Sequence, residues 1–416
     1  MAQIIDTLVV GAGQAGLLMS QALTKRGIPH IVLEREAVAH RWRTQRWDSL
    51  KLQQPNWLSH LPDTPYPPAE ADPDGFPTAR EMHDFLNGFA VSIGAPVRTG
   101  VSVDRLQRLG EDGPFRAETS GGVIEADNVV IATGAMQVPV RPELLRHRGD
   151  IQQLTAGDYR NPGELADGTV LVVGGGNSGC QIAEDLLRAG RRVILSLGRH
   201  RRVPRRYRGK DIFWWFRETG ILRTPVEKMP ADMSPIVFAG GGNTIDMRRF
   251  AHEGIILTGK LTAVEGDVLT FTGDLGDTLA HGDAFYRQML DRFDALQRER
   301  GLDLPEDAEA RRVWPDAPCI THPIRQLHLR DAGVGSIIWA TGYRSDYRWI
   351  KLPIASESGA LRHRKGVTEI PGLYFIGLHW QSNLSSSFVF GVQHDVDPIA
   401  DEIAARQPRE RCLARG

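Results

Sequence analysis

Cysteine is scarce in this sequence of 416 residues, which contains three: Cys180, Cys319 and Cys412. No two of them have the spacing of a Cys-x-x-Cys redox pair or of a zinc knuckle. An enzyme that passes electrons to a paired dithiol is therefore not expected. We likewise expect no metal site, because His379 also lacks partners in a metal-ligand pattern.

An excess of either charge and a long hydrophobic run are also absent. The 50 lysines and arginines balance 51 acids, a formal net charge of −1, so the whole molecule has no field that would gather nucleic acid or anionic lipid. The apolar stretch 4–10 is too short for a membrane span and leads directly into a glycine. We expect a cytoplasmic protein with no integral membrane segment and no nucleic-acid partner, and a homodimer stays open.

What the sequence does contain is the same glycine-rich turn at two places. Residues 6–16 read Asp-Thr-Leu-Val-Val-Gly-Ala-Gly-Gln-Ala-Gly, and residues 168–179 read Gly-Thr-Val-Leu-Val-Val-Gly-Gly-Gly-Asn-Ser-Gly. Each passes from a short apolar strand into glycines that let the backbone turn tightly and approach a pyrophosphate, whose charge lies at the positive end of the next helix. Two such turns predict two bound dinucleotides that exchange electrons or hydride.

The two units differ at the end of their second strand. The first is expected to run strand 7–10, helix 14–26 and strand 30–33, and then Glu34, whose carboxylate can accept hydrogen bonds from ribose hydroxyls. The second runs helix 178–189 and strand 192–195, with no acid at the strand end; Ser196 and Arg199 could bind a 2′-phosphate there. We therefore expect NADPH in preference to NADH. The alternative is that the basic run 199–210 is a solvated or nucleic-acid-facing patch.

Further segments complete the expected fold, which is α/β with two Rossmann-like dinucleotide-binding domains, the second inserted in the first. The hydrophobic strands before Gly134 and Gly342 suit a close approach to a nucleotide, and 372–379 followed by a helix within 387–406 would complete the first domain. The expected boundaries are 1–158 with 331–416 for the first domain, and 159–330 for the second, including an insertion at 205–329. Residues 239–246 imitate the second glycine turn but have Ile245 in place of its last glycine, so we predict a loop.

With these motifs in place, the chain resembles the class B flavoprotein monooxygenases, which include the flavin-containing monooxygenases and the plant indole-3-pyruvate monooxygenases. It is most similar to short bacterial members often described as flavoproteins linked to cation transport. The resemblance runs nearly end to end and is carried by the segments 11–16, 41–52, 131–134, 159–162, 174–179 and 340–343. It implies FAD in the first domain, NADPH in the second, and O2 and a small organic molecule as substrates.

The resemblance and the glycine turns together give an expected set of cofactor-binding residues. For FAD these are Gly11, Gly13, Gln14, Ala15, Gly16, Glu34, Arg35, Arg41, Trp42, Leu52, Val103, Thr133, Gly134 and Gly377. For NADPH they are Gly174, Gly176, Asn177, Ser178, Gly179, Ser196, Arg199, Thr341 and Gly342. Trp42 and Trp47 could equally be core aromatics.

One family signature is altered in this chain. It has a Phe-x-Gly turn and, further on, a histidine four residues before the aromatic of a Tyr-Arg pair. Here Gly149 and Tyr159 are present, but His147 falls at the phenylalanine position and Thr155 at the histidine position. We expect this change to affect the coupling between NADPH binding and the rest of the cycle more than the nucleotide sites.

The chemistry that the resemblance implies needs few catalytic side chains. Hydride passes from NADPH to the flavin, O2 adds to form a C4a-(hydro)peroxyflavin, and oxygen is transferred to a soft nitrogen or sulfur, or to a ketone or keto acid. Catalytic residues are not identified; Gln53, Asn56, His379 and Asn383 are candidates, which could equally satisfy local backbone groups. The aromatic segment 211–216 could cover a substrate entrance or belong to a core. The alternative function is an NADPH-dependent reductase or oxidase, or a nucleotide-bound sensor, that inserts no oxygen.

Overall fold

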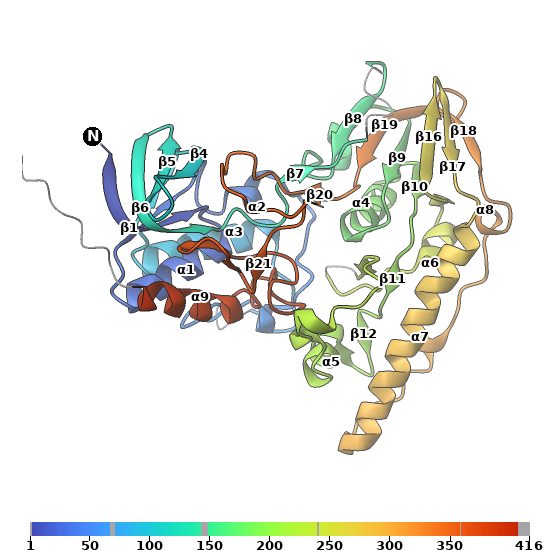
Figure 1. The fold of residues 1–416 in the computed structure, drawn as a ribbon. Helices are drawn as coiled ribbons and strands as arrows, with labels where there is room; N and C mark the ends of the chain where they lie inside the picture. The colour runs from blue at the N-terminus through green and yellow to red at the C-terminus, as the bar shows by residue number, and fades with distance from the viewer. Residues whose placement is uncertain (1, 67–70, 143–148, 239–240, 358, 407–416) are drawn as a thin grey trace, which may run out of the picture.

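The computed structural model describes residues 2–66, 71–142, 149–238, 241–357 and 359–406. Two α/β units lie side by side (Figure 1), each built on a sheet whose central strands are parallel. The strands of the first sheet come from residues 3–131 and 363–375, and those of the second from the segment between them. The expected fold class, with one Rossmann-like unit inserted in another, is confirmed.

The first unit takes strands from both ends of the chain. Its sheet has the order β21-β22-β23-β6-β1-β2-β3, with β4 and β5 branching from β6. The strands are β1 (Gln3–Val10), β2 (His30–Leu33), β3 (Val97–Arg98), β4 (Val103–Arg108), β5 (Phe115–Thr119), β6 (Gly122–Ile131), β21 (His363–Arg364), β22 (Val367–Thr368) and β23 (Leu373–Phe375). The helices are α1 (Gln14–Lys25), α2 (His40–Thr44), η1 (Asn56–Leu58), α3 (Ala79–Ser92) and α9 (Gln393–Ala405).

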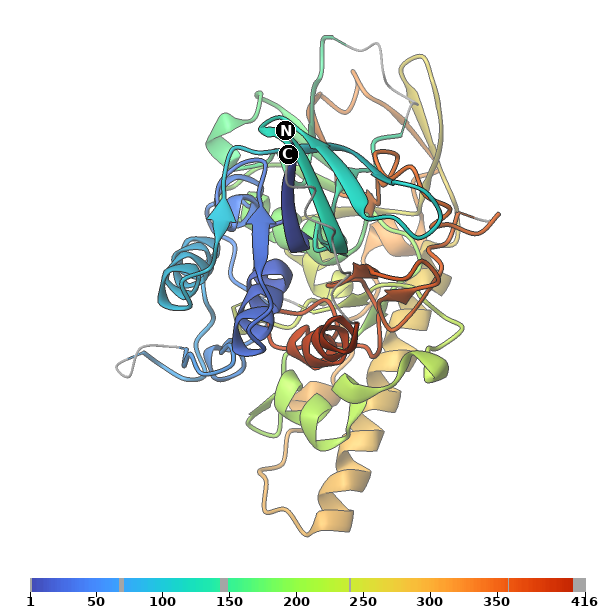
Figure 2. The same ribbon diagram turned by 60° about the vertical axis from the view of Figure 1, so that its left-hand side comes forward.

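Successive residues of the central strands face two different layers, as the alternation of side chains along a strand requires. On one face Val9 and Val130 are buried with Ile399 of α9. On the other face Val10 is buried with Phe115 of β5. Figure 2 shows α1 and α9 side by side beneath the sheet, in blue and red. The sheet is therefore covered on both faces, by helices and by the β4–β5 hairpin.

The second unit repeats this plan around a sheet of five strands in the order β15-β10-β9-β19-β8, all parallel. They are β8 (Gln152–Thr155), β9 (Thr169–Val173), β10 (Val193–Ser196), β15 (Ile256–Thr258) and β19 (Val334–Trp339). One face packs on α4 (Asn177–Arg188) and α6 (Met247–His252). The other packs on an antiparallel sheet of β16 (Leu261–Glu265), β17 (Val268–Phe271) and β18 (Gln326–His328).

An aromatic cluster fills the part of the second unit that lies toward the first. The elements around it are β11 (Arg201–Arg202), β12 (Arg206–Tyr207), β13 (Lys210–Asp211), α5 (Ile212–Glu218), η4 (Ile221–Arg223), η5 (Val226–Lys228), β14 (Ile236–Val237) and the long helix α7 (Leu275–Arg300). Trp215 is fully buried and stacks on Phe293 with ring centroids 4.8 Å apart. Most of the aromatic segment 211–216 therefore forms a core. The remaining short elements are η3 (Pro162–Glu164), η6 (Glu309–Arg311) and α8 (Pro318–Thr321).

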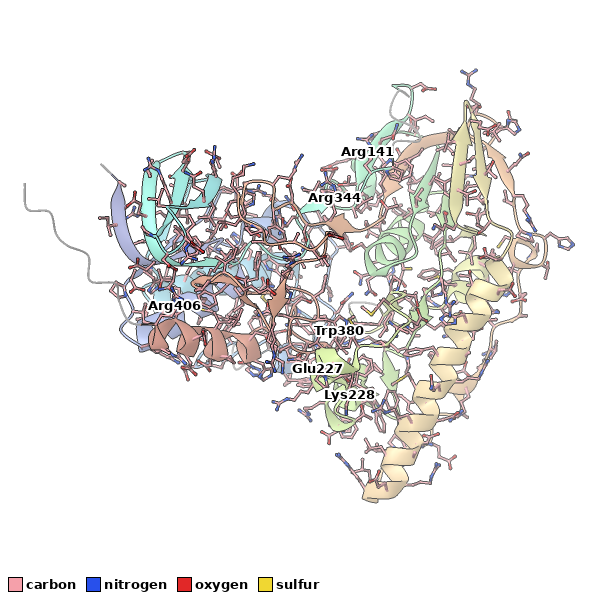
Figure 3. The ribbon with its side chains drawn as sticks, viewed as in Figure 1. Arg141, Glu227, Lys228, Arg344, Trp380 and Arg406 are labelled. Carbon is pink, nitrogen blue, oxygen red and sulfur yellow. The ribbon has the colours of Figure 1, made fainter. Side chains whose placement is uncertain are left out.

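The helices and second strands predicted around both glycine turns are confirmed to within about one residue, and the helix expected within 387–406 is α9. The first strand, expected at 7–10, begins earlier, at Gln3. The limits of the second unit differ from the expected 159–330. Both β8 and β19 pair inside its sheet, because the buried strand β19 needs a neighbour on each side, so its strands run from Gln152 to Trp339. The two units are joined where β7 (Val138–Pro139) pairs with β20 (Tyr343–Arg344), near Arg141 and Arg344 in Figure 3.

Two smaller predictions also have an outcome. Residues 241–246 form an irregular loop that ends at Asp246, the N-cap of α6, as predicted; residues 239 and 240 lie outside the described ranges. None of the helices in the described ranges combines the length and the apolar character that a membrane crossing requires.

Candidate nucleotide-binding cavity

The first glycine turn is closed by contacts that leave no room for a side chain. Gly11 has φ +109°, and a Cβ there would lie 2.6 Å from the carbonyl oxygen of Ala132, at the end of β6. A Cβ on Gly16 would lie 1.9 Å from the carbonyl oxygen of Gly11, so helix α1 packs directly on the turn. Gly13, in contrast, faces open space. This geometry leaves the backbone at Gly13 free for close approach by a ligand.

The second glycine turn has the same geometry. Gly174 has φ +119°, and a Cβ there would lie 2.3 Å from the carbonyl oxygen of Ala340, at the end of β19. A Cβ on Gly179 would lie 1.9 Å from the carbonyl oxygen of Gly174. Gly176 faces open space, as Gly13 does. Gly16, Gly174 and Gly179 thus shape the turns from behind and do not line the cavity described next.

A single cavity of about 840 Å³ lies between the two units and reaches both glycine turns. From the expected FAD set it is lined by Gly11, Gly13, Gln14, Ala15, Glu34, Arg35, Arg41, Trp42, Leu52, Val103, Thr133, Gly134 and Gly377. From the expected NADPH set it is lined by Gly176, Asn177, Ser178 and Gly342. The structure therefore brings most of the predicted residues together around one space.

In the described residues, neither of the two helices that begin at the cavity has a side-chain N-cap. Gly13 is the N-cap of α1 and Gly176 the N-cap of α4, and within the described residues no side chain accepts a hydrogen bond at either cap. The first backbone N–H groups of a helix need acceptors and carry its positive end. Each helix therefore presents an anion-binding backbone to the cavity.

Glu34 fixes the end of β2 beside the first turn. Its carboxylate accepts hydrogen bonds from the backbone N–H of Ala12 at 2.9 Å and of Glu36 at 3.1 Å. It also lines the cavity. The side chain is thereby held at the cavity wall beside the first glycine turn.

Two arginines and a tryptophan of the segment 41–46 line the cavity. Arg41 donates hydrogen bonds to the carbonyl oxygens of Met136 and Gln137, and burial lowers its pKa from the ordinary value. Arg46, which the sequence analysis did not single out, also lines the cavity, and its guanidinium lies 5.2 Å from the ring centroid of Trp42. Trp47 is 5% exposed and belongs to the core, while Trp42 is partly buried and reaches the cavity.

Several residues expected at the site are engaged elsewhere. Ser196 donates to the carbonyl oxygen of Gly259 at 2.9 Å, accepts from the N–H of Leu261 and is buried, so the prediction that it contacts a 2′-phosphate is wrong. The side chain of Thr341 donates to the carbonyl oxygen of Val140, outside the cavity lining.

The side chain of Asn177 bonds backbone groups as well, donating to the carbonyl oxygen of Ile236 and accepting from the N–H of Phe238. The side chain of Asn177 therefore ties the start of α4 to β14. Arg199 does not line the cavity; its side chain is 65% exposed and contacts Asp232 and His281.

Two of the four catalytic candidates reach the cavity. Gln53 and His379 line it, whereas Asn56 and Asn383 do not. Asn56 is buried and donates to the carbonyl oxygen of Asp72, and Asn383 accepts from the N–H and hydroxyl of Ser385. These two loop amides satisfy local groups, which was the alternative interpretation.

His379 is the one titratable candidate among them. Its Nδ1 lies 2.8 Å from the Ser387 hydroxyl oxygen, and desolvation by the surrounding protein lowers its pKa from the ordinary value. A neutral imidazole can both donate and accept a hydrogen bond. His379 and Ser387 therefore supply a polar pair on the cavity wall.

The segment with the altered signature holds the two units together. Thr155 donates its backbone N–H and its hydroxyl to Asp158, at 2.9 and 2.7 Å, so it forms a local turn; His147 lies outside the described residues. Asp185 of α4 accepts hydrogen bonds from Ser49 and from the buried Tyr159, both at 2.6 Å. Burial and this bond raise the pKa of Tyr159. Asp185 thus links the cavity-lining loop of the first unit to a helix of the second.

A second contact between the units joins η5 to the segment that follows β23. The N–H of Val226 donates to the carbonyl oxygen of Ser382 at 2.8 Å, and Figure 3 labels Trp380 and Glu227 in this region. From the aromatic cluster, Phe213 and Phe388 reach the cavity, with ring centroids 6.2 Å apart. This end of the cavity is therefore aromatic.

Comparison with known proteins adds a family to this geometry. Residues 8–210 match the family model described as pyridine nucleotide-disulphide oxidoreductase. An uncharacterized CzcO-like oxidoreductase from Geobacillus kaustophilus is 31% identical over 412 residues, 97% of this chain and 99% of that protein. The indole-3-pyruvate monooxygenase YUCCA1 of Oryza sativa is 26% identical over 396 residues, 91% of this chain and 88% of that protein. The solved structure of a flavin-containing monooxygenase from Stenotrophomonas maltophilia has a TM-score of 0.66 at 18% identity, and the match covers 97% of this chain and 99% of that one.

Proposed function

The chain belongs with the CzcO-like oxidoreductases, and we propose that it is a class B flavoprotein monooxygenase that uses FAD and NADPH in this cavity. The first glycine turn would hold FAD and the second NADPH, and the enzyme would oxygenate a small organic substrate with O2. The observation that carries the proposal is the single cavity of about 840 Å³ that reaches both turns. A shared space allows hydride transfer without release of either nucleotide.

The residues present fit these two cofactors. A dinucleotide needs a backbone that its pyrophosphate can approach, and Gly13 and Gly176 each leave open space at the start of a helix. Glu34, held by two backbone N–H groups, would accept hydrogen bonds from the adenosine ribose of FAD. Leu52 and Val103 would contact the same cofactor. Arg41 would hold the segment between β6 and β7 next to FAD, through its hydrogen bond to the carbonyl oxygen of Met136.

The aromatic end of the cavity is proposed to admit the substrate. Phe213 and Phe388 offer apolar contacts, while Gln53 and the pair His379–Ser387 offer hydrogen bonds. This combination suits a molecule with an apolar body and one polar atom, such as a soft amine or sulfide, a ketone or a keto acid. Bound flavin would supply electron transfer from NADPH to O2. The protein would orient the substrate, exclude water and, through neutral His379, hold a proton at Nδ1 or Nε2.

The test is the stoichiometry of oxygen insertion. The purified yellow protein is supplied with NADPH, ¹⁸O2 and a panel of amines, sulfides, ketones and keto acids, and products are analysed by mass spectrometry. We expect at least one substrate to accelerate NADPH oxidation and to gain one ¹⁸O atom. If NADPH oxidation only reduces O2 to hydrogen peroxide with every compound of the panel, the protein is a reductase or oxidase and the proposed oxygenation is wrong.

Two variants locate the substrate end. Replacing Gln53→Leu or His379→Phe should raise the KM for the substrate and the fraction of NADPH lost to peroxide, because each removes a hydrogen-bonding group from the cavity wall. His322→Phe is the matched control, since His322 is exposed directly after α8 and does not line the cavity. If Gln53→Leu and His379→Phe have the same KM and the same peroxide fraction as His322→Phe, these two side chains do not contact the substrate.

A further inference from the structure

A charged cluster lies just past the end of β10, where the chain leaves the second nucleotide-binding turn. Arg199 Nη2 lies 3.7 Å from Asp232 Oδ2 and 3.3 Å from His281 Nδ1. His281 Nε2 lies 3.0 Å from the same Asp232 oxygen. The three side chains come from the loop after β10, the loop before β14 and helix α7, so only the fold brings them together.

Asp232 is held in place by the backbone around it. Its Oδ1 accepts a hydrogen bond from the N–H of Ser234 at 2.9 Å, and this bond holds its pKa at about 2. Arg201 donates two hydrogen bonds to the carbonyl oxygen of Ser234, at 3.1 and 2.7 Å. The loop then enters β14, which pairs with β11. The carboxylate is therefore charged and fixed beside Arg199.

This cluster lies in the loop of the second unit that is equivalent to the loop carrying Glu34 in the first. Glu34 directly follows β2 and lines the cavity, whereas Arg199 lies three residues past the end of β10, the equivalent strand, and outside the cavity lining. In such folds the residues after this strand meet the adenosine ribose. Ser196 is excluded from that role because its hydroxyl bonds Gly259 and Leu261. Arg199 is then the group available to a 2′-phosphate. Its guanidinium already lies beside the carboxylate of Asp232.

We propose that Asp232 is a specificity-determining residue that competes with the 2′-phosphate of NADPH for Arg199 and His281, so that the site also accepts NADH. The inference rests on the proposed NADPH site. A phosphate that approaches Arg199 meets the repulsion of a carboxylate 3.7 Å from the guanidinium, whereas a ribose with two free hydroxyls can donate a hydrogen bond to that carboxylate. The same acid therefore weakens the phosphorylated nucleotide and favours the unphosphorylated one.

The experiment measures binding, without turnover. FAD-loaded protein is titrated by calorimetry with 2′,5′-ADP and with 5′-AMP at fixed pH and ionic strength, and the ratio of their dissociation constants reports the contribution of the 2′-phosphate. Asp232→Asn removes the charge and keeps an acceptor for Ser234. Asp232→Ser is a second variant, because a serine hydroxyl can also accept from that N–H. Asp277→Asn is the control, since Asp277 is an exposed acid on the same helix as His281.

We expect both Asp232 variants to raise the preference for 2′,5′-ADP by roughly fivefold, the effect of one partly exposed charge. Arg199→Gln should abolish the preference and Asp277→Asn should leave it unchanged. An unchanged preference in the Asp232 variants, or an equal change in Asp277→Asn, overturns the inference and leaves the proposed function standing. If neither nucleotide binds the FAD-loaded protein, the second nucleotide site itself is refuted, and both proposals fall.

Discussion

The two glycine turns of this protein are nearly the same in backbone and different in side chains. Gly11 and Gly174 share a positive φ, and Gly16 and Gly179 share a Cβ position only 1.9 Å from a backbone oxygen. The difference begins after the second strand of each unit. In the first unit Glu34 accepts a hydrogen bond from Ala12 of the glycine turn. In the second unit Arg199 and Asp232 follow the strand and form an ion pair. We therefore propose that the turn allows a dinucleotide to bind, and that the residues after the next strand select which dinucleotide binds.

The largest expected effect separates the two turns from each other. Gly16→Ala should yield protein without bound flavin, and Gly179→Ala should keep flavin but lose NADPH affinity by on the order of 100-fold, because each added methyl overlaps a backbone oxygen. The absorbance spectrum of bound flavin and calorimetric NADP⁺ titration measure this. Gly88→Ala, in open space on α3, is the control. Loss of flavin from Gly179→Ala would show that the turns do not act separately.

The next effect concerns the link between the units. Asp185→Asn weakens the hydrogen bonds that hold Ser49 and Tyr159, so we expect flavin reduction by NADPH to slow about tenfold while FAD stays bound, a cost of ~1–3 kcal/mol. Stopped-flow reduction under anaerobic conditions measures the rate. Ser49→Ala and Tyr159→Phe, which each remove one donor, should give smaller losses. A rate equal to that of the original protein would mean that the link does not position the cofactors.

A third pair of variants compares the strand ends. Glu34→Gln should weaken FAD binding about tenfold, because a charged acceptor of two backbone N–H groups becomes neutral, and should leave NADPH binding unchanged. Ser196→Ala should lower the free energy of unfolding by ~1–2 kcal/mol, since Gly259 and Leu261 lose a buried partner. It should not alter the preference for 2′,5′-ADP. Urea unfolding and nucleotide titration distinguish the two outcomes, and a changed preference would return Ser196 to the phosphate site.

The smallest effect on stability is expected at the middle glycines. Gly13→Ala and Gly176→Ala place a methyl where no protein atom lies within 4 Å, so the free energy of unfolding without cofactor should stay within about 0.5 kcal/mol. Any loss of FAD or NADPH affinity then reports the approach of the ligand itself. Full affinity in both variants would mean that neither pyrophosphate passes close to these residues.

The sequence predicted the parts of the molecule that depend on local pattern. The strands and helices around the glycine turns follow from apolar runs and from positions that only glycine can occupy. The structure confirms these elements. Asp232 was missed because it is brought to Arg199 by the pairing of β11 with β14, which no local signal shows. Arg46 was missed because a cation in a basic, aromatic segment has no pattern of its own. Amides such as Asn56 and Asn383 could not be ranked, because their partners are defined by loop conformation.

The pairing of β7 with β20 bears on how such a protein can be rebuilt. The chain leaves the first unit through Val138–Pro139 and returns through Tyr343–Arg344, and these two segments are hydrogen-bonded neighbours. An insert whose entry and exit are adjacent can be exchanged for another of the same plan without stretching its host. Chimaeras with splice points at β7 and β20 should therefore accept a foreign pyridine-nucleotide module, which makes cofactor preference a transplantable property of this scaffold.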